Sequence, residues 1–123
     1  MAIRVLDSNT FDEAIHSHEL VAVDFWAKWC GPCVAFGPVF EQVSEAFPDV
    51  LFAKVDIEEC PDLAADFNIR SVPMLMIFKQ DIAVFAESGA HTAHTLSELI
   101  SSAKALDISQ VLDEIKKITE AKK

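Results

Sequence analysis

The sequence predicts an α/β fold in which helices flank a central mixed β-sheet. Stretches rich in β-branched and aromatic residues alternate along the chain with amphipathic stretches of helical period. Residues 20–26 are almost uninterruptedly apolar, which is typical of a strand buried on both faces of a parallel sheet. The last two strand-like stretches follow each other directly, which indicates an antiparallel hairpin at one edge of the sheet.

The first half of the chain is predicted to form two strand–helix units and a third strand. Residues with N-cap preference precede the first helix, and apolar residues recur along both helices at the spacing of one buried face. Pro38 lies inside the second helix, where it removes one backbone donor, so we expect a bend there. In chain order the elements are a strand at 2–6, a helix at 11–18, a strand at 20–26, a helix from Cys33 to about Phe47 and a strand at 50–56.

The second half is predicted to form a short helix, a hairpin and two further helices. Pro73 stands at the start of its strand, where a missing N–H is tolerated. The last helix carries an apolar stripe, which we expect to pack on its own domain; the alternative is another protein or protomer. In chain order the elements are a helix at 59–67, strands at 72–79 and 82–87, and helices at 93–105 and 107–121.

Composition restricts the classes of function. The 123 residues include 20 acidic and 10 basic side chains, a net charge of −10, so we expect no nucleic-acid partner, because such binding needs basic patches. No apolar run approaches the roughly 20 residues that cross a bilayer, so we expect no membrane partner either. The first residues do not form a signal-peptide pattern, which favours a cytoplasmic protein. Three cysteines are a poor disulfide framework and favour reactive thiols.

The clearest chemical motif is Cys30-Gly31-Pro32-Cys33, between a buried strand and a helix. Unpaired amides and the helix dipole at a helix N-terminus stabilise an anion, so the thiolate of Cys30 is favoured there. Pro32 suits the first helical turn, where its absent N–H is not needed. We expect Cys30 to be the exposed nucleophile and Cys33 the shielded resolving thiol. The alternative is a zinc site, which needs four ligands, whereas the sequence has no second Cys-x-x-Cys pair.

A carboxylate, Asp24, interrupts the buried strand six residues before Cys30. Burial should raise the pKa of Asp24 toward the range that is useful for acid–base catalysis. We expect Asp24 to take a proton from Cys33, directly or through water, when Cys33 attacks a mixed disulfide. The alternative is a structural Asp24 paired with Lys54 on the neighbouring strand, and the two roles are compatible.

Several motifs, in the same order and at the same spacing, resemble the thioredoxin family. They are the stretch from Val23 to Cys33 that ends in Trp-Cys-Gly-Pro-Cys, Pro38, and the stretches 52–56, 69–75 and 89–90. The resemblance covers residues 1–105 and implies a thioredoxin domain there, with residues 106–123 as a C-terminal helical extension.

The resemblance also implies an activity. The chain would be a protein thiol–disulfide oxidoreductase that reduces disulfide-containing client proteins and maintains cell redox homeostasis. It would bind no cofactor and would receive electrons from NADPH through a thioredoxin reductase. Pro73 would be cis and face the two sulfurs, and the backbone of Val72 would hydrogen-bond an extended client segment. Beside the catalytic Cys30, Cys33, Asp24 and Lys54, the client-binding residues would be Trp29, Gly31, Pro32, Val72, Pro73, Gly89 and Ala90.

Two alternative functions stay open. An oxidase or isomerase on the same fold usually carries His before the second cysteine, where this chain has Pro32. A binding subunit that uses the C-terminal helix often loses a cysteine, whereas both are retained here.

The third cysteine, Cys60, lies at a predicted helix start that would lower its pKa and make it a regulatory thiol. We favour an incidental small residue instead.

Overall fold

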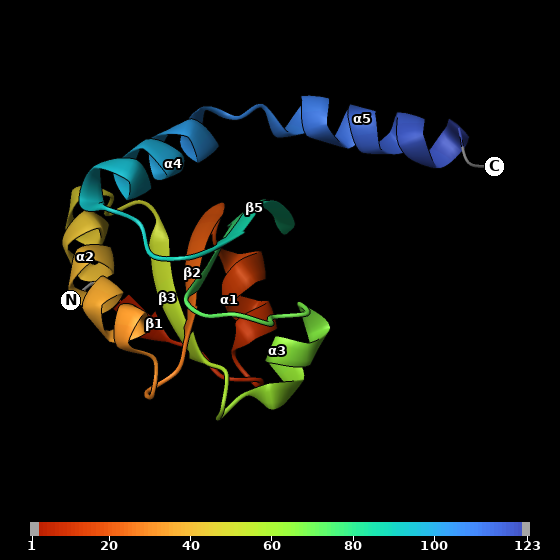
Figure 1. The fold of residues 1–123 in the computed structure, drawn as a ribbon. Helices are drawn as coiled ribbons and strands as arrows, with labels where there is room; N and C mark the ends of the chain where they lie inside the picture. Colours follow the sequence, from red (N-terminus) through yellow and green to blue (C-terminus); the bar gives the residue numbers. More distant parts are fainter. Residues whose placement is uncertain (1–2, 122–123) are drawn as a thin grey trace.

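The computed structural model describes residues 3–121, with side chains described as far as Ile118 (Figure 1). The predicted order of elements is confirmed, although the first strand begins at Ile3 because Ala2 lies outside the described residues. The strands are β1 Ile3–Val5, β2 Leu20–Trp26, β3 Leu51–Asp56, β4 Met74–Lys79 and β5 Ile82–Ser88. The helices are α1 Phe11–Ser17, α2 Gly31–Ala46, α3 Pro61–Asp66, α4 Ala93–Ala105 and α5 Ile108–Ala121.

The five strands form one mixed sheet in the order β1-β3-β2-β4-β5. The pairs β1–β3 and β2–β3 are parallel, whereas β4 runs antiparallel to β2 and pairs with β5 in the predicted hairpin. Strand β2 is central and buried from Leu20 to Phe25, as its continuous apolar sequence predicts. The carboxyl end of β2 leads directly into the loop that carries the two motif cysteines.

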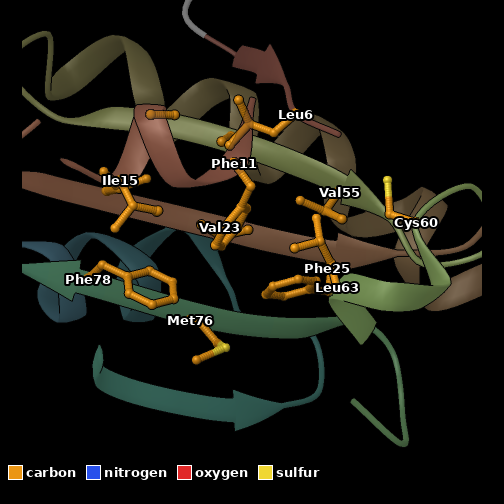
Figure 2. Packing of buried hydrophobic residues seen from close by; sticks show 13 residues of the cluster. Leu6, Phe11, Ile15, Val23, Phe25, Val55, Cys60, Leu63, Met76 and Phe78 are labelled. Carbon is orange, nitrogen blue, oxygen red and sulfur yellow. The ribbon is translucent and has the colours of Figure 1, made fainter. Parts of the chain in front are cut away.

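Helices cover both faces of the sheet (Figure 1). On the face covered by α1 and α3, apolar side chains of both helices pack against alternate β2 residues Val23 and Phe25 (Figure 2). Aromatic rings dominate this core, and those of Phe11 and Phe67 lie 5.3 Å apart between centroids. On the other face, Leu20 and Ala22 pack with apolar residues of α2 and α4. Asp24 follows Leu20 and Ala22 in the period-two alternation, so it points toward the α2 face.

The hairpin turn holds two residues other than glycine in the left-handed region. Gln80 has φ 48° and Asp81 has φ 71°, the signs that a two-residue turn between twisted strands requires. The Asp81 carboxylate also pairs with Nδ1 of His16, and both side chains are exposed. The turn therefore combines a local conformational cost with a weak surface interaction.

Replacing Asp81 with glycine should leave the protein as stable as before or more stable. Glycine removes a left-handed penalty of about 1 kcal/mol, whereas the lost exposed ion pair contributes less than about 1 kcal/mol. Thermal unfolding measures the difference. The matched control is Asp81→Ala, which also loses the ion pair but keeps the conformational penalty, so it should melt at a lower temperature. Equal destabilisation of the two variants would contradict this explanation.

The C-terminal helix differs from the preferred prediction. Ile108 in its first turn is 7 % exposed, but Leu112, Ile115 and Ile118 are 48 %, 46 % and 58 % exposed. Beyond that turn α5 extends away from the rest of the domain (Figure 1). The prediction that the stripe packs on its own domain is therefore wrong for most of the helix. Within residues 3–121, no helix is both long enough and apolar enough to cross a membrane.

Candidate functional site

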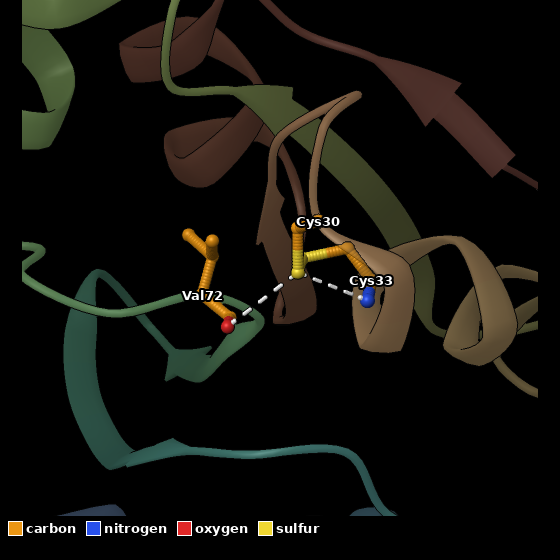
Figure 3. Close-up of a disulfide and its surroundings, with 3 residues drawn as sticks. All are labelled: Cys30, Cys33 and Val72. Carbon is orange, nitrogen blue, oxygen red and sulfur yellow. Dashed lines mark hydrogen bonds between the residues drawn. A yellow bond between two sulfur atoms is a disulfide. The ribbon is translucent and has the colours of Figure 1, made fainter.

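The motif cysteines lie where β2 passes into α2. Cys30 is the N-cap of α2, and its backbone N–H donates to the carbonyl of Ala27 at 3.2 Å. Cys30 and Cys33 form a disulfide, with their Cα atoms 5.2 Å apart (Figure 3). Pro32 lies in the first turn of α2 and Pro38 inside the helix, which continues through it to Ala46. The two-residue spacing thus brings both sulfurs together within one helical turn.

Two polar backbone groups contact the sulfur of Cys30 (Figure 3). The N–H of Cys33 donates to Cys30 Sγ at 3.1 Å, and the carbonyl oxygen of Val72 lies 3.7 Å from the same sulfur. After reduction, the Cys33 N–H is placed to stabilise a Cys30 thiolate, because a hydrogen bond to an anion is stronger than one to a neutral sulfur. The Val72 carbonyl is placed to accept from the protonated thiol. Both forms of Cys30 therefore have a partner.

Cys30 is less exposed than expected. Cys30 is 5 % exposed and Cys33 is 1 % exposed. Cys30 is therefore the more exposed of the two cysteines, as expected, but the prediction that it is an exposed residue is wrong. The reason is tertiary, because Ala27, Ile57 and Val72 come from three different loops and surround the two sulfurs. Only a small part of Cys30 is open to a client.

The residues expected to bind clients lie in loops beside the cysteines. Trp29 is 68 % exposed, and Gly31 and Pro32 are exposed in the first turn of α2. The Val72-Pro73 peptide bond is cis, as the resemblance implies, and Pro73 is buried. A second loop joins this one, because the N–H of Gly89 donates to the carbonyl of Pro73 at 2.8 Å. Gly89 has φ 111°, which only glycine adopts readily, and it is exposed together with Ala90.

Asp24 is fully buried in the middle of β2. Its carboxylate oxygens accept no hydrogen bond from the part of the chain that the structure describes. Burial raises the pKa of Asp24 to about 7, and the positive charge of Lys54 offsets part of that rise. The expected direction of the pKa is therefore confirmed, with desolvation as its main cause. A carboxyl with this pKa exchanges protons near neutral pH.

Lys54 does not form the close ion pair with Asp24 that the alternative hypothesis from the sequence required. The two residues are register partners on β3 and β2, but Lys54 Nζ lies 4.5 Å from the centroid of the Trp26 ring. Lys54, Trp26 and Gly37 line a cavity of about 420 Å³ between β1, β3 and α2. Lys54 therefore lowers the pKa of Asp24 through its positive charge and not through an ion pair in direct contact.

Cys60 is buried in the core beneath α3, at 3 % exposure (Figure 2). Burial raises the pKa of the Cys60 thiol. The prediction that the helix start lowers this pKa, on which a regulatory role depended, is therefore wrong. Desolvation outweighs the N-terminus of α3, a helix of only 6 residues. The interpretation of Cys60 as an incidental core residue agrees with this environment. Within residues 3–121, no three His, Cys, Asp or Glu side chains are grouped so that they could hold a metal ion.

Ile57, which packs against the two sulfurs, is a site residue that sequence analysis did not identify. It directly follows β3, and its N–H donates to the carbonyl of Trp26 at 3.0 Å. Strands β2 and β3 are parallel neighbours, so the residues after them meet at one edge of the sheet. The strand order would have revealed Ile57, but no local pattern does.

Comparisons with known proteins agree with this site. The family model described as Thioredoxin matches residues 2–102. The protein that bears the name thioredoxin 2 in Streptomyces coelicolor is 47 % identical over 106 residues, which cover 86 % of this chain and 79 % of that protein. Thioredoxin-2 of Pyricularia oryzae is 41 % identical over 96 residues, which cover 78 % of this chain and 56 % of that longer protein.

A solved structure extends the likeness to three dimensions. A mutant thioredoxin from Halobacterium salinarum superposes with a TM-score of 0.77 at 32 % identity, covering 81 % of this chain and 88 % of that one. The matched regions include the strand–loop–helix unit that holds the Cys30–Cys33 disulfide. The chain therefore belongs to the thioredoxin family, and it is a thiol–disulfide oxidoreductase.

Proposed function

We propose that this oxidoreductase is a cytoplasmic protein-disulfide reductase that takes electrons from NADPH through a thioredoxin reductase. The observation that carries the proposal is the hydrogen bond from the Cys33 N–H to Cys30 Sγ at the N-terminus of α2. This bond and the helix dipole both favour a thiolate on Cys30, which is the species that attacks a client disulfide. Gly31 and Pro32 between the cysteines also resemble reductases more than oxidases or isomerases.

The reaction consists of two thiol–disulfide exchanges. The Cys30 thiolate attacks one sulfur of a client disulfide, the client S–S bond breaks, and the other client sulfur leaves as a thiolate. Cys33 then loses its proton, attacks Cys30 Sγ within the mixed disulfide, and releases the second client thiolate. The enzyme is left as the Cys30–Cys33 disulfide, and two electrons have passed to the client.

In this proposal Asp24 is the proton acceptor for Cys33. Asp24 points toward the face of the sheet that α2 covers, and its pKa of about 7 suits it to both accepting and releasing a proton. The positive charge of Lys54 stabilises the ionised carboxylate and keeps the pKa of Asp24 from rising further.

The client would bind across the exposed apolar surface around Cys30. An extended segment can pair with the backbone of Val72, while Trp29 and the exposed Gly31, Pro32, Gly89 and Ala90 form the surroundings. The hydrogen bond between Gly89 and Pro73 keeps the two client-binding loops in one arrangement. Because the contacts are mainly apolar and main-chain, this surface favours unfolded or flexible client segments over one particular sequence.

Reduction of insulin in the presence of NADPH and a thioredoxin reductase tests the proposal. We expect NADPH consumption that depends on this protein and on the reductase together. The Cys30→Ser variant is the control for non-enzymatic reduction and should return the rate to background. Failure to couple to any thioredoxin reductase, together with net oxidation of a reduced dithiol peptide, would favour the oxidase alternative.

A further inference from the structure

The imidazole of His91 is a buried polar group that the proposed reaction does not use. Its side chain is 8 % exposed, although it lies in the loop that joins β5 to α4. Its Nε2 has no hydrogen-bond partner in the part of the chain that the structure describes. The carboxylate oxygen Oε1 of Glu87 lies 3.8 Å from this nitrogen, which is beyond hydrogen-bond length. Hydrogen bonding at Nε2 therefore does not hold the ring in its position.

The ring of His91 packs between α2 and β5 instead. Its centroid lies 6.3 Å from that of Phe36 on α2 and 6.4 Å from that of Phe85 on β5. Both distances are within the range of aromatic contacts in protein cores. Phe36 follows Cys33 by three residues on the same side of α2, and both are buried. The ring therefore connects the loop after β5 with the helix that carries the two cysteines.

His91 is the only anchor within its own segment. Residues 86–90 and Thr92 are all exposed, so His91 is the one residue between Phe85 and Ala93 that is not. Gly89, which has φ 111°, lies in the middle of this stretch, and glycine has more conformational freedom to lose than any other residue. A segment of this kind stays in one place only if a neighbouring side chain fixes it.

The segment that His91 anchors is also tied to the cysteines from the other side. The N–H of Gly89, two residues before His91, donates to the carbonyl of Pro73 at 2.8 Å. The carbonyl of the preceding residue, Val72, lies 3.7 Å from Cys30 Sγ (Figure 3). A closed series of contacts thus runs from α2 through the segment 89–91 and the cis-proline loop back to Cys30. Without His91, this series is open at the side of α2.

We propose that His91 is a positioning residue for client binding, whose ring keeps Gly89 and Ala90 at the client-binding surface. The inference rests on the proposed function, in which these two residues contact the client. The polar contacts of Cys30 Sγ come from Cys33 and Val72, so the chemistry at the sulfur does not depend directly on His91. His91 therefore sets how tightly a client binds and not how fast a bound client reacts.

Single-turnover exchange between the reduced protein and a disulfide peptide tests this role without a thioredoxin reductase. His91→Ala removes the ring, so the half-saturating peptide concentration should rise at least about tenfold while the limiting rate stays within about twofold. His91→Leu fills a similar volume and should restore the half-saturating concentration of the parent protein, because packing and not polarity positions the segment. The matched control is His94→Ala, which removes an imidazole that is 84 % exposed on α4 and should behave like the parent protein.

Amide hydrogen exchange measures the position of the segment independently of any reaction. The bond to Pro73 protects the Gly89 N–H, so His91→Ala should speed its exchange at least about tenfold. The amides of the central strand β2 should keep their protection, which distinguishes local loosening from a general loss of stability.

Three results would overturn the positioning role of His91. They are unchanged exchange of the Gly89 amide in His91→Ala, a fall in its limiting rate with no change in half-saturation, and equal impairment of His91→Leu and His91→Ala. A parent protein that exchanges with the peptide but couples to no thioredoxin reductase would contradict the proposed reductase function alone.

Discussion

Replacing Cys33 with serine should convert the protein into a covalent trap for its clients, whereas Cys30→Ser should abolish turnover. In the proposed reaction Cys33 resolves the mixed disulfide, so without its sulfur the bond between Cys30 and the client should persist. Cys30 is the more exposed of the two, and its sulfur receives the Cys33 N–H. Serine keeps this N–H and the size of the side chain, so the fold should be maintained.

Non-reducing electrophoresis of Cys33→Ser after incubation with oxidised insulin measures the trap. A band that contains both proteins and disappears with dithiothreitol is expected, and Cys30→Ser should give none. Cys60→Ser is the matched control for a general loss of thiols, because Cys60 is buried in the core beneath α3. Cys60→Ser should keep full turnover. Trapping by Cys30→Ser and not by Cys33→Ser would reverse the assigned roles.

The Asp24→Asn variant should gain stability relative to the parent protein as pH rises from about 4 to 7. In the folded protein the pKa of Asp24 is about 7, against 3.8 for an ordinary Asp. Between these values the unfolded carboxyl is ionised while the folded one stays protonated, so the free energy of unfolding of the parent protein falls with pH. The fall ends near pH 7, where the folded carboxyl also ionises, and it totals up to about 4 kcal/mol.

Urea unfolding of the oxidised proteins at pH 4.5, 6 and 8 measures this difference. Oxidised protein is used because the Cys30–Cys33 disulfide is then the same in both proteins. The variant should lack the part of the slope that Asp24 contributes, and the gap between the two proteins should widen with pH. Parallel pH profiles would show that Asp24 has an ordinary pKa.

The same variant should slow the second exchange and not the first. Asn cannot accept the Cys33 proton, so release of the client from the mixed disulfide should slow by about 100-fold near pH 7. Rapid-quench measurement with a disulfide peptide separates the two steps, because the first releases one client thiol and the second releases the other. An equal loss in both steps would mean that Asp24 acts only through the structure of the site.

Most of the fold could be predicted from local pattern. The continuous apolar run of β2 and the directly adjacent β4 and β5 are enough to predict a mixed sheet with a hairpin at one edge, and both are found. Helix and strand boundaries differ from prediction by a few residues because terminal turns depend on tertiary contacts. The Gln80-Asp81 turn shows how far tertiary pairing overrides propensity, because two residues other than glycine adopt positive φ there.

Only part of the candidate site could be predicted from local sequence pattern. A Cys-x-x-Cys pair between a strand and a helix, and a carboxyl inside a buried strand, predict their own chemistry, because helix dipoles and desolvation act locally. Ile57 and the hydrogen bond from Gly89 to Pro73 were not predictable, because they join segments that are distant along the chain. For the same reason the burial of Cys30 was missed.

The sequence by itself determined the α/β order, the redox pair and the direction of the pKa shift of Asp24, because each depends on a residue and its immediate neighbours along a strand or helix. The tertiary structure alone decided three other features. It surrounded Cys30 with Ala27, Ile57 and Val72, it kept Lys54 apart from the Asp24 carboxylate, and it left the face of α5 open. These features depend on how loops and helices meet at the edges of the sheet. Hydrophobic periodicity and secondary-structure propensity along the sequence carry no information about those meetings.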